Sequence, residues 1–209
     1  MEVKADNSPL RFGALWMSTA DPKQDTPEAV ALLQLAVTGD SAAFAQIVSR
    51  HERRILSLAW RLLGSLEDAE DAAQETFLRA FKYLHRCDAS RPIEGWLVRI
   101  AVNVCRDLGR SRQRRGVVSE ETDPPLAAAD PFSGVALEQQ KRMLYQALAN
   151  LPEKERTAVV LRDLEGLSTA EVAGALGSTQ ATVRSQISSA RVKIRRAIGQ
   201  MTRKKGAGQ

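Results

Sequence analysis

Hydrophobic and polar residues recur with a helical period along most of this chain, and capping residues mark where the periodic segments end. In the first half, Asp40 precedes one such segment and Gly64 follows it. Ser65 and Asp68 have the spacing of a capping box for the next. The pattern predicts four helices in this half, over residues 27–37, 41–63, 66–84 and 95–115.

The second half has the same character, with helices predicted over residues 137–151, 152–165, 169–177 and 179–198. Ser168 and Glu171 are spaced as a capping box, and Gly177 is suited to end the short helix that they begin. The next helix starts at once, near Thr179. Two helices joined this closely are typical of a helix-turn-helix.

Residues 117–134 interrupt the helical pattern with three prolines, four acidic residues and no basic residue. This composition is typical of a flexible linker. Because aromatic residues make up only 5% of the chain, while Ala, Leu, Arg and Glu dominate it, we expect an all-α fold of two small helical domains. The expected boundaries are an N-terminal extension at 1–25, a first domain at 26–115, a linker at 116–135, a helix-turn-helix domain at 136–200 and a basic tail at 201–209.

Composition narrows the classes of function. Cys87 and Cys105 lie too far apart for a CxxC motif and have no His cluster nearby, and His51 and His85 are isolated from each other, so neither a zinc site nor another cofactor site is expected. No carboxylate pair, paired nucleophile or GxxxxGK[ST] motif appears at suitable spacing, which argues against an enzyme. Without an apolar run of membrane-spanning length or a signal-peptide pattern, the expectation is a cytoplasmic protein with no membrane span. The net charge of +5 and the pI near 9.5 fit a polyanionic partner.

The predicted helix at 95–115 divides its residues by face. The apolar stripe consists of Leu97, Ile100, Ala101, Val104 and Leu108. The opposite side carries Arg99, Asn103, Arg106 and Arg110, with Trp96 at its margin. Such a density of positive charge favours contact with a nucleic-acid backbone. The Trp beside the Asn would add a stacking surface and a base-edge donor. A role for Trp96 as a partly buried packing residue is an equally open alternative.

The predicted helix at 179–198 has a similar division. Val183, Ile187, Ala190 and Ile194 form its inward stripe. Arg184, Ser188, Arg191 and Arg195 lie on the outward side, with Ser185 beside them. No acidic residue follows Glu171, whereas eight Arg or Lys do. A recognition helix in a major groove would use such a face, whereas an ordinary charged hairpin would mix the signs of its surface charges.

The predicted helix at 66–84 is acidic in its first half, which holds Glu67, Asp68, Glu70, Asp71 and Glu75. Compensation of the helix dipole would need only one or two of these residues. An acidic face followed by Phe77 and Phe81 favours a docking surface for a basic partner helix. A solvated face backed by core phenylalanines is the alternative.

Taken together, these segments resemble a bacterial extracytoplasmic-function (ECF) RNA polymerase sigma factor over residues 27–198. The resemblance depends on DAEDAAQETFLRAF, on GWLVRIAVN with its basic continuation, and on LPEKERTAVVLRDLEGLSTAEVAGALG followed by TVRSQISSAR. Each motif is weak alone, but their order and spacing make the combination very specific. It implies a first domain of the sigma region 2 type and a second of the region 4 type.

The resemblance also implies roles for individual residues. Asp71, Gln74, Glu75, Phe77 and Phe81 would bind the β′ clamp coiled coil of core RNA polymerase. Trp96, Arg99, Asn103, Arg106 and Arg110 would recognise and melt the minus-ten promoter element, and the loop from His85 to Glu94 would receive a flipped-out base. Arg184, Ser185, Ser188, Arg191 and Arg195 would read the minus-thirty-five element. Control by an anti-sigma factor is implied as well.

Two other classes of protein stay open from the residues alone. A stand-alone helix-turn-helix regulator would explain residues 137–205 but would leave the helices at 66–84 and 95–115 without a role. Such a regulator predicts tight binding to duplex DNA without polymerase. A protein-interaction adaptor predicts no salt-dependent affinity for DNA.

Overall fold

The computed structural model describes residues 27–90, 92–115 and 135–206, and every element within them is helical. The predicted N-terminal extension and nearly all of the predicted linker lie outside these residues. The first half contains α2 (Pro27–Val37), α3 (Ser41–Leu63), α4 (Leu66–Lys82), the 3-10 turn η2 (Leu84–Arg86) and α5 (Ile93–Arg115). The second half contains α6 (Val135–Ala149), α7 (Glu153–Val159), the five-residue π-helical segment η4 (Val160–Leu164), α8 (Thr169–Leu176) and α9 (Gln180–Gly206).

The predicted capping residues hold the helix ends in place. The Asp40 carboxylate accepts hydrogen bonds from the amides of Ala42 and Ala43, at 2.8 and 3.0 Å, and so begins α3. Gly64 ends α3 in the left-handed region, at φ 76°, where glycine avoids the steric cost of a Cβ. Ser168 and Glu171 form the predicted reciprocal capping box of α8.

The core of the N-terminal lobe, which consists of α2 to α5 with η2, is built around α5. Leu97, Ala101 and Val104 are buried as predicted, while Ile100 and Leu108 are partly buried against the same core. The buried face is wider than the predicted stripe, because Val98, Val102 and Cys105 are buried as well. The reason is that α5 packs against both α3 and α4, so it needs two apolar faces instead of one.

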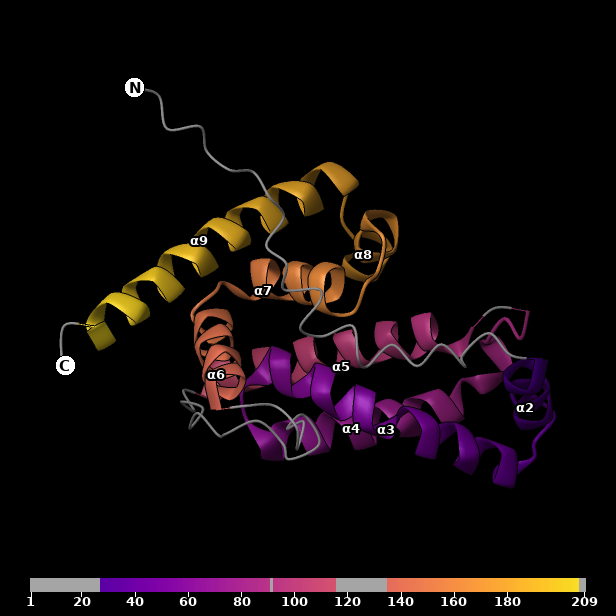
Figure 1. Ribbon diagram of the computed structural model, residues 1–209. Coiled ribbons are helices and arrows are strands. Elements are labelled where there is room, and N and C mark those ends of the chain that lie inside the picture. The colour runs from indigo at the N-terminus through magenta and orange to yellow at the C-terminus, as the bar shows by residue number, and fades with distance from the viewer. Residues whose placement is uncertain (1–26, 91, 116–134, 207–209) are drawn as a thin grey trace.

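In the C-terminal lobe, which consists of α6 to α9 with η4, the long helix α9 packs against α6, α7 and α8. Its predicted inward stripe is buried, at Val183, Ile187, Ala190 and Ile194. Figure 1 shows α8 and α9 joined by a short turn at the tip of this lobe, as the helix-turn-helix prediction requires. Gly177 ends α8 at φ 59°, again in the left-handed region.

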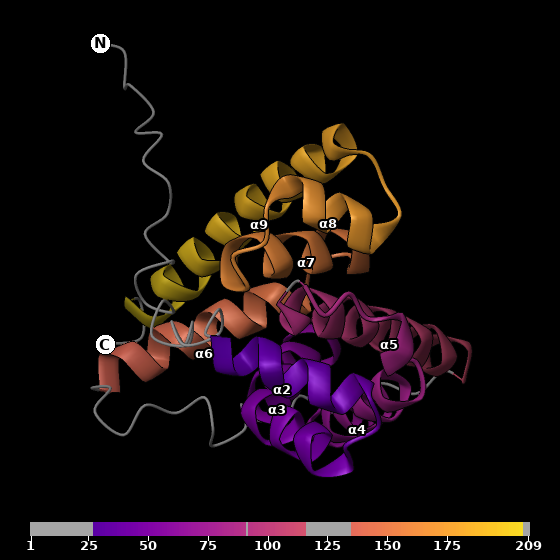
Figure 2. The same ribbon diagram turned by 90° about the vertical axis from the view of Figure 1, so that its right-hand side faces the viewer.

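The two lobes lie in direct contact. Helix α3 contacts α6, α7 and η4, and the ring of Trp60 on α3 meets the ring of Tyr145 on α6 edge-on, with centroids 4.4 Å apart. Figures 1 and 2 agree that α6 and α7 lie between α9 and the N-terminal lobe. Helix α9 is therefore on the outer side of the molecule. No helix among the described residues is long and apolar enough to cross a membrane.

Candidate functional site

The outward face of α5 is accessible in the structure. Arg99, Asn103 and Arg110 are exposed, and Trp96 and Arg106 are half-buried. Trp96 packs partly against the core, so its ring is fixed in orientation while part of it stays open to solvent. Such a ring can act as a rigid stacking platform without first being ordered by a ligand.

Several arginines of α5 contact carboxylates from other helices. Arg106 lies 3.7 Å from Glu153 of α7, measured from Nε to Oε1, and Arg112 pairs with Asp68 of α4. Asp107, the single acidic residue that the sequence places within 95–115, pairs with Arg79 of α4 at 3.3 Å. Neither Asp68 nor Glu153 could be predicted as a counter-charge from the sequence, since no local spacing links them to α5. Of the predicted minus-ten residues, Arg106 is therefore partly neutralised by the other lobe.

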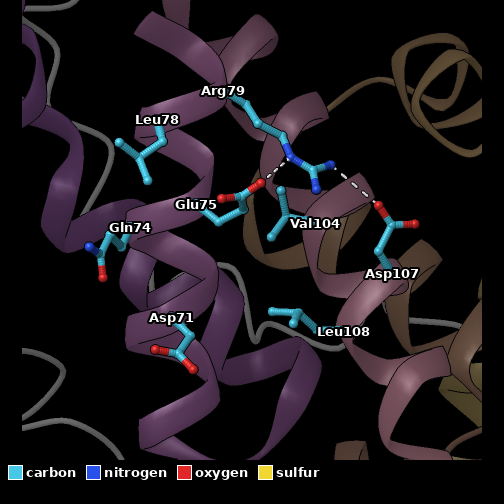
Figure 3. Close-up of a pocket in the computed structure, with 8 residues that line it drawn as sticks. All are labelled: Asp71, Gln74, Glu75, Leu78, Arg79, Val104, Asp107 and Leu108. Atoms are coloured by element: carbon cyan, nitrogen blue, oxygen red, sulfur yellow. Dashed lines mark hydrogen bonds and ion pairs between the residues drawn. The ribbon is translucent and has the colours of Figure 1, made fainter. Parts of the chain in front are cut away.

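A surface hollow of about 400 Å³ runs between α4 and α5 (Figure 3). It is lined by Asp71, Gln74, Glu75, Leu78, Arg79, Val104, Asp107 and Leu108. The dashed lines in Figure 3 connect Glu75 to Arg79 at 2.6 Å and Arg79 to Asp107, so Arg79 bridges the two helices. The hydrogen bond to Glu75 is the main reason that the pKa of Arg79 is raised, and the bond to Asp107 raises it further.

Exposed apolar side chains accompany these acids on α4. Leu78 and Phe81 are 58% and 57% exposed, and the Phe81 ring lies 5.1 Å from that of Phe44 on α3. Phe77 is instead partly buried against the core. The predicted docking residues thus form a surface with Asp71, Gln74 and Phe81 accessible, Glu75 already paired with Arg79, and Phe77 in a supporting position.

The predicted base-accepting loop at 85–94 is shorter than expected, since α5 begins at Ile93. Glu94 lies within α5, and its carboxylate is 3.7 Å from Arg54 on α3. Before α5, the guanidinium of Arg86 stacks over the Tyr83 ring at 5.0 Å, and Asp88 accepts hydrogen bonds from the Ser90 amide and hydroxyl. Arg91 is outside the described residues.

The outward face of α9 carries its five predicted DNA-contacting residues in exposed positions: Arg184, Ser185, Ser188, Arg191 and Arg195. Arg184 donates a hydrogen bond to the Gln180 side chain one turn earlier, at 3.2 Å, near the N-terminal end of the helix. Arg191 donates hydrogen bonds to Asp163 of η4, a partner that no spacing in the sequence indicates. The residues lie along one side of a single helix, as contact with a groove would require.

The described residues contain no group of three or more His, Cys, Asp or Glu side chains that could hold a metal ion. Burial raises the pKa of the Cys105 thiol to about 12, which leaves it protonated at neutral pH. Burial is also the main cause of the raised pKa of Cys87.

Comparison with known proteins agrees with this geometry. The family description "Sigma-70 region 2" matches residues 47–115, and "Sigma-70, region 4" matches residues 141–194. The chain is 37% identical over 177 residues to the ECF RNA polymerase sigma factor SigE of Mycolicibacterium smegmatis, covering 82% of this chain and 68% of that protein. It is 34% identical to the ECF RNA polymerase sigma factor SigM of Mycobacterium tuberculosis, covering 80% of this chain and 83% of that protein.

A solved structure with the same fold is that of the sigma factor RpoE from Bartonella quintana in complex with the anti-sigma factor NepR. It matches with a TM-score of 0.64 at 22% identity, covering 75% of this chain and 96% of that one. The two helical lobes, their order along the chain and the identity to curated relatives over both lobes lead to one assignment. The chain belongs to the ECF RNA polymerase sigma factors.

Proposed function

We propose that the two lobes of this sigma factor read separate promoter elements, α5 the minus-ten element and α9 the minus-thirty-five element. The observation that carries this proposal is the pair of exposed, basic helix faces in different lobes, each backed by a buried apolar stripe. The buried stripe fixes the direction of each basic face, so the cations point outward without a ligand to order them. Neutralising DNA phosphates with such faces releases counterions and makes binding salt-dependent.

For promoter melting, the useful features of α5 are Trp96 and Asn103. Unstacking a base costs on the order of a few kcal/mol, which a stacking surface and fixed hydrogen-bonding groups can offset. The half-buried Trp96 ring offers such a surface, and the exposed Asn103 amide offers both a donor and an acceptor. Arg99 and Arg110 flank Asn103 on the exposed face and would hold the phosphates. Melting in this way requires no hydrolysis by the protein.

For the minus-thirty-five element, α9 would enter the major groove with its N-terminal end foremost. Arg184 is close to that end and exposed, so it is placed to reach base edges, and Ser185 and Ser188 lie beside it. Arg191 and Arg195, farther along the helix, would contact the backbone. These residues are exposed while the two lobes are in contact, and α9 lies on the outer side of the molecule (Figure 2).

Core polymerase would bind the accessible surface of α4. Asp71 and Gln74 beside the exposed Phe81 and Leu78 combine negative charge with apolar area, which fits a partner helix that is basic and amphipathic, such as the β′ clamp coiled coil. An anti-sigma factor that covers this surface would prevent polymerase binding. Because the protein works together with RNA polymerase, we place it in the cytoplasm.

Transcription in vitro tests the proposal. The full chain with purified core polymerase should initiate at specific sites in a library of genomic promoters, and should bind those promoters specifically only with core present. A stand-alone regulator would bind its duplex site tightly without core and would not start transcription. Absence of any salt-dependent DNA affinity with core present would indicate an interaction adaptor and refute the proposal.

A further inference from the structure

A buried cluster of charges joins the two lobes. Glu165, the residue after η4, has a side chain only 3% exposed, and its two oxygens contact two arginines of α3. Oε1 lies 2.5 Å from a terminal nitrogen of Arg61, and Oε2 lies 3.1 Å from Nε of Arg54. Arg54 also reaches Glu94 of α5 at 3.7 Å. A carboxylate of the C-terminal lobe is thus enclosed by cations of the N-terminal lobe, more than a hundred residues away in the sequence.

The contacts around this cluster combine apolar and polar groups. The Trp60–Tyr145 ring pair lies on the α3–α6 side, and the Arg106–Glu153 pair lies between α5 and α7. Among the described residues, the buried indole N–H of Trp60 has no hydrogen-bond acceptor. Burying a polar group without a partner opposes the contact. This mixture is typical of an interface between domains that separate, rather than of a single fused core.

The closed arrangement cannot serve both promoter elements at once. Elements centred about 25 base pairs apart are separated by about 85 Å along B-form DNA. A compact chain of about 200 residues has a radius of gyration of about 16 Å and is only about 45 Å across. If α5 and α9 read the two elements, as the proposed function holds, the lobes must move apart.

We propose that Glu165 with Arg54 and Arg61 forms an interlobe latch that holds the free sigma factor closed and unable to span a promoter. Opening exposes both arginines to solvent and releases Arg106 from Glu153, so that the face of α5 becomes complete. Core polymerase and promoter DNA bind the open form and must supply the free-energy difference between the two forms. The closed form therefore lowers the apparent affinity for polymerase, and a weaker latch raises it.

The latch can be tested on the free, full-length protein by measuring the distance between spin labels on the two lobes. The labels are placed at Gln46→Cys on α3 and Ala170→Cys on α8, both exposed positions, with Cys87→Ser to remove the half-buried thiol. In the parent protein, the distances should form one short population. Glu165→Gln keeps the shape of the side chain but removes its charge, and it should increase the long-distance population about tenfold or more.

Two further variants replace the arginines of the N-terminal lobe that contact Glu165. Arg61→Gln should open the lobes as Glu165→Gln does, and the double variant should open them little further, because both substitutions remove the same interaction. Arg54→Gln, which affects a more exposed cation, should have a smaller effect in the same direction. Circular dichroism verifies that each variant keeps its helices; if Arg61→Gln loses them, Arg54→Gln and Glu165→Gln still decide the question.

A matched control is available in Glu155→Gln. Glu155 contacts Ser189 and Lys193 of α9, within its own lobe, so its neutralisation should leave the interlobe distances unchanged. Unchanged distances in Glu165→Gln and Arg54→Gln would overturn the latch and leave the proposed function standing, because the measurement uses neither polymerase nor DNA. Conversely, failure to support transcription would overturn the proposed function whatever the distances show. With limiting sigma factor, Glu165→Gln should also bind core polymerase more tightly than the parent.

Discussion

Arg191 of α9 donates two hydrogen bonds to the carboxylate of Asp163, from Nε to Oδ2 at 2.9 Å and from a terminal nitrogen to Oδ1 at 2.6 Å. This paired geometry holds the guanidinium at a set position on the outward face, and it is the main reason that the pKa of Arg191 is raised. It also neutralises a cation that we assign to DNA. A phosphate would have to displace the Asp163 carboxylate or share the guanidinium with it, so we expect the pair to weaken DNA binding.

Asp163→Asn should therefore strengthen binding of the polymerase holoenzyme to promoter DNA. With Arg191 available to a phosphate, the slope of log affinity against log salt should become steeper by about 0.9. Filter binding at a series of salt concentrations measures this slope. In an Arg191→Ala background, Asp163→Asn should have no such effect, and an equal steepening there would show that Asp163 acts through another cation.

Arg184→Ala should reduce discrimination at one base pair of the minus-thirty-five element by about 1–3 kcal/mol, since a base-edge contact is lost. The measurement is holoenzyme affinity for a set of promoters with single base-pair substitutions. Lys193→Ala is the control, because Lys193 lies on the same helix but pairs with Glu155. It should leave the base preferences as they are. If Arg184→Ala discriminated between bases as well as the parent at every position, Arg184 would not take part in reading the sequence.

Gln74→Ala should weaken binding to core polymerase without affecting the fold, because the Gln74 side chain is exposed on α4. Glu75→Lys should weaken it more, by reversing a charge and by breaking the bond to Arg79, although an i,i+4 pair stabilises a helix by only about 0.5 kcal/mol. Titration of core with labelled sigma factor gives the affinities. Glu52→Lys, an exposed charge reversal on α3, should bind normally. Unaltered binding of Glu75→Lys would contradict the assignment of this surface.

Asn103→Ala should impair strand opening more than initial promoter binding, because we assign its amide to the separated strand. Permanganate reactivity of thymines reports the melted region, and a mobility shift at low temperature reports the closed complex. The expected result is weakened permanganate reactivity with closed-complex affinity nearly retained. An equal loss in both assays would make Asn103 a general DNA contact.

The sequence predicts the helices well because their determinants are local. The bounds of α3 agree with the expectation at both ends, since Asp40 and Gly64 act on adjacent backbone groups. Helix α4 stops at Lys82, two residues early, where the chain tightens into η2. The predicted helix at 152–165 divides into α7 and a π-helical segment, a change of hydrogen-bond register that no periodicity reveals.

The partners of the candidate site residues could not be predicted. Hydrophobic periodicity shows which side of α5 or α9 is outward, but not what lies opposite it. Glu153 meets Arg106, and Glu165 meets Arg61 across the lobe contact, over separations that leave no spacing pattern in the sequence. In the sequence, the acidic residues of 152–165 look like the solvent-exposed charges of an ordinary helix. Only the packing of η4 against α3 brings Glu165 to the arginines of the other lobe.

His51 provides a test of the N-terminal core through pH. It is only 8% exposed, and burial, followed by the charges of Arg54 and Arg50, lowers its pKa from 6.5 to about 4. The unfolded chain takes up a proton near pH 6.5, whereas the folded chain resists it until about pH 4. The contribution of the neutral His51 to the free energy of unfolding is therefore fully present above pH 6.5. It is lost as the pH falls to about 4, by up to about 3 kcal/mol.

His51→Leu removes the titrating group. As the pH is lowered from 7 to 4, the free energy of unfolding of the variant should therefore rise relative to that of the parent, by up to about 3 kcal/mol. Urea titrations followed by circular dichroism at several pH values measure the difference, and the protonation of carboxylates cancels because both proteins share it. His85 is exposed, so His85→Leu serves as the control for replacing a surface histidine by leucine. If the plots of unfolding free energy against pH were parallel for His51→Leu and the parent, His51 would accept a proton as readily in the folded protein as in the unfolded chain.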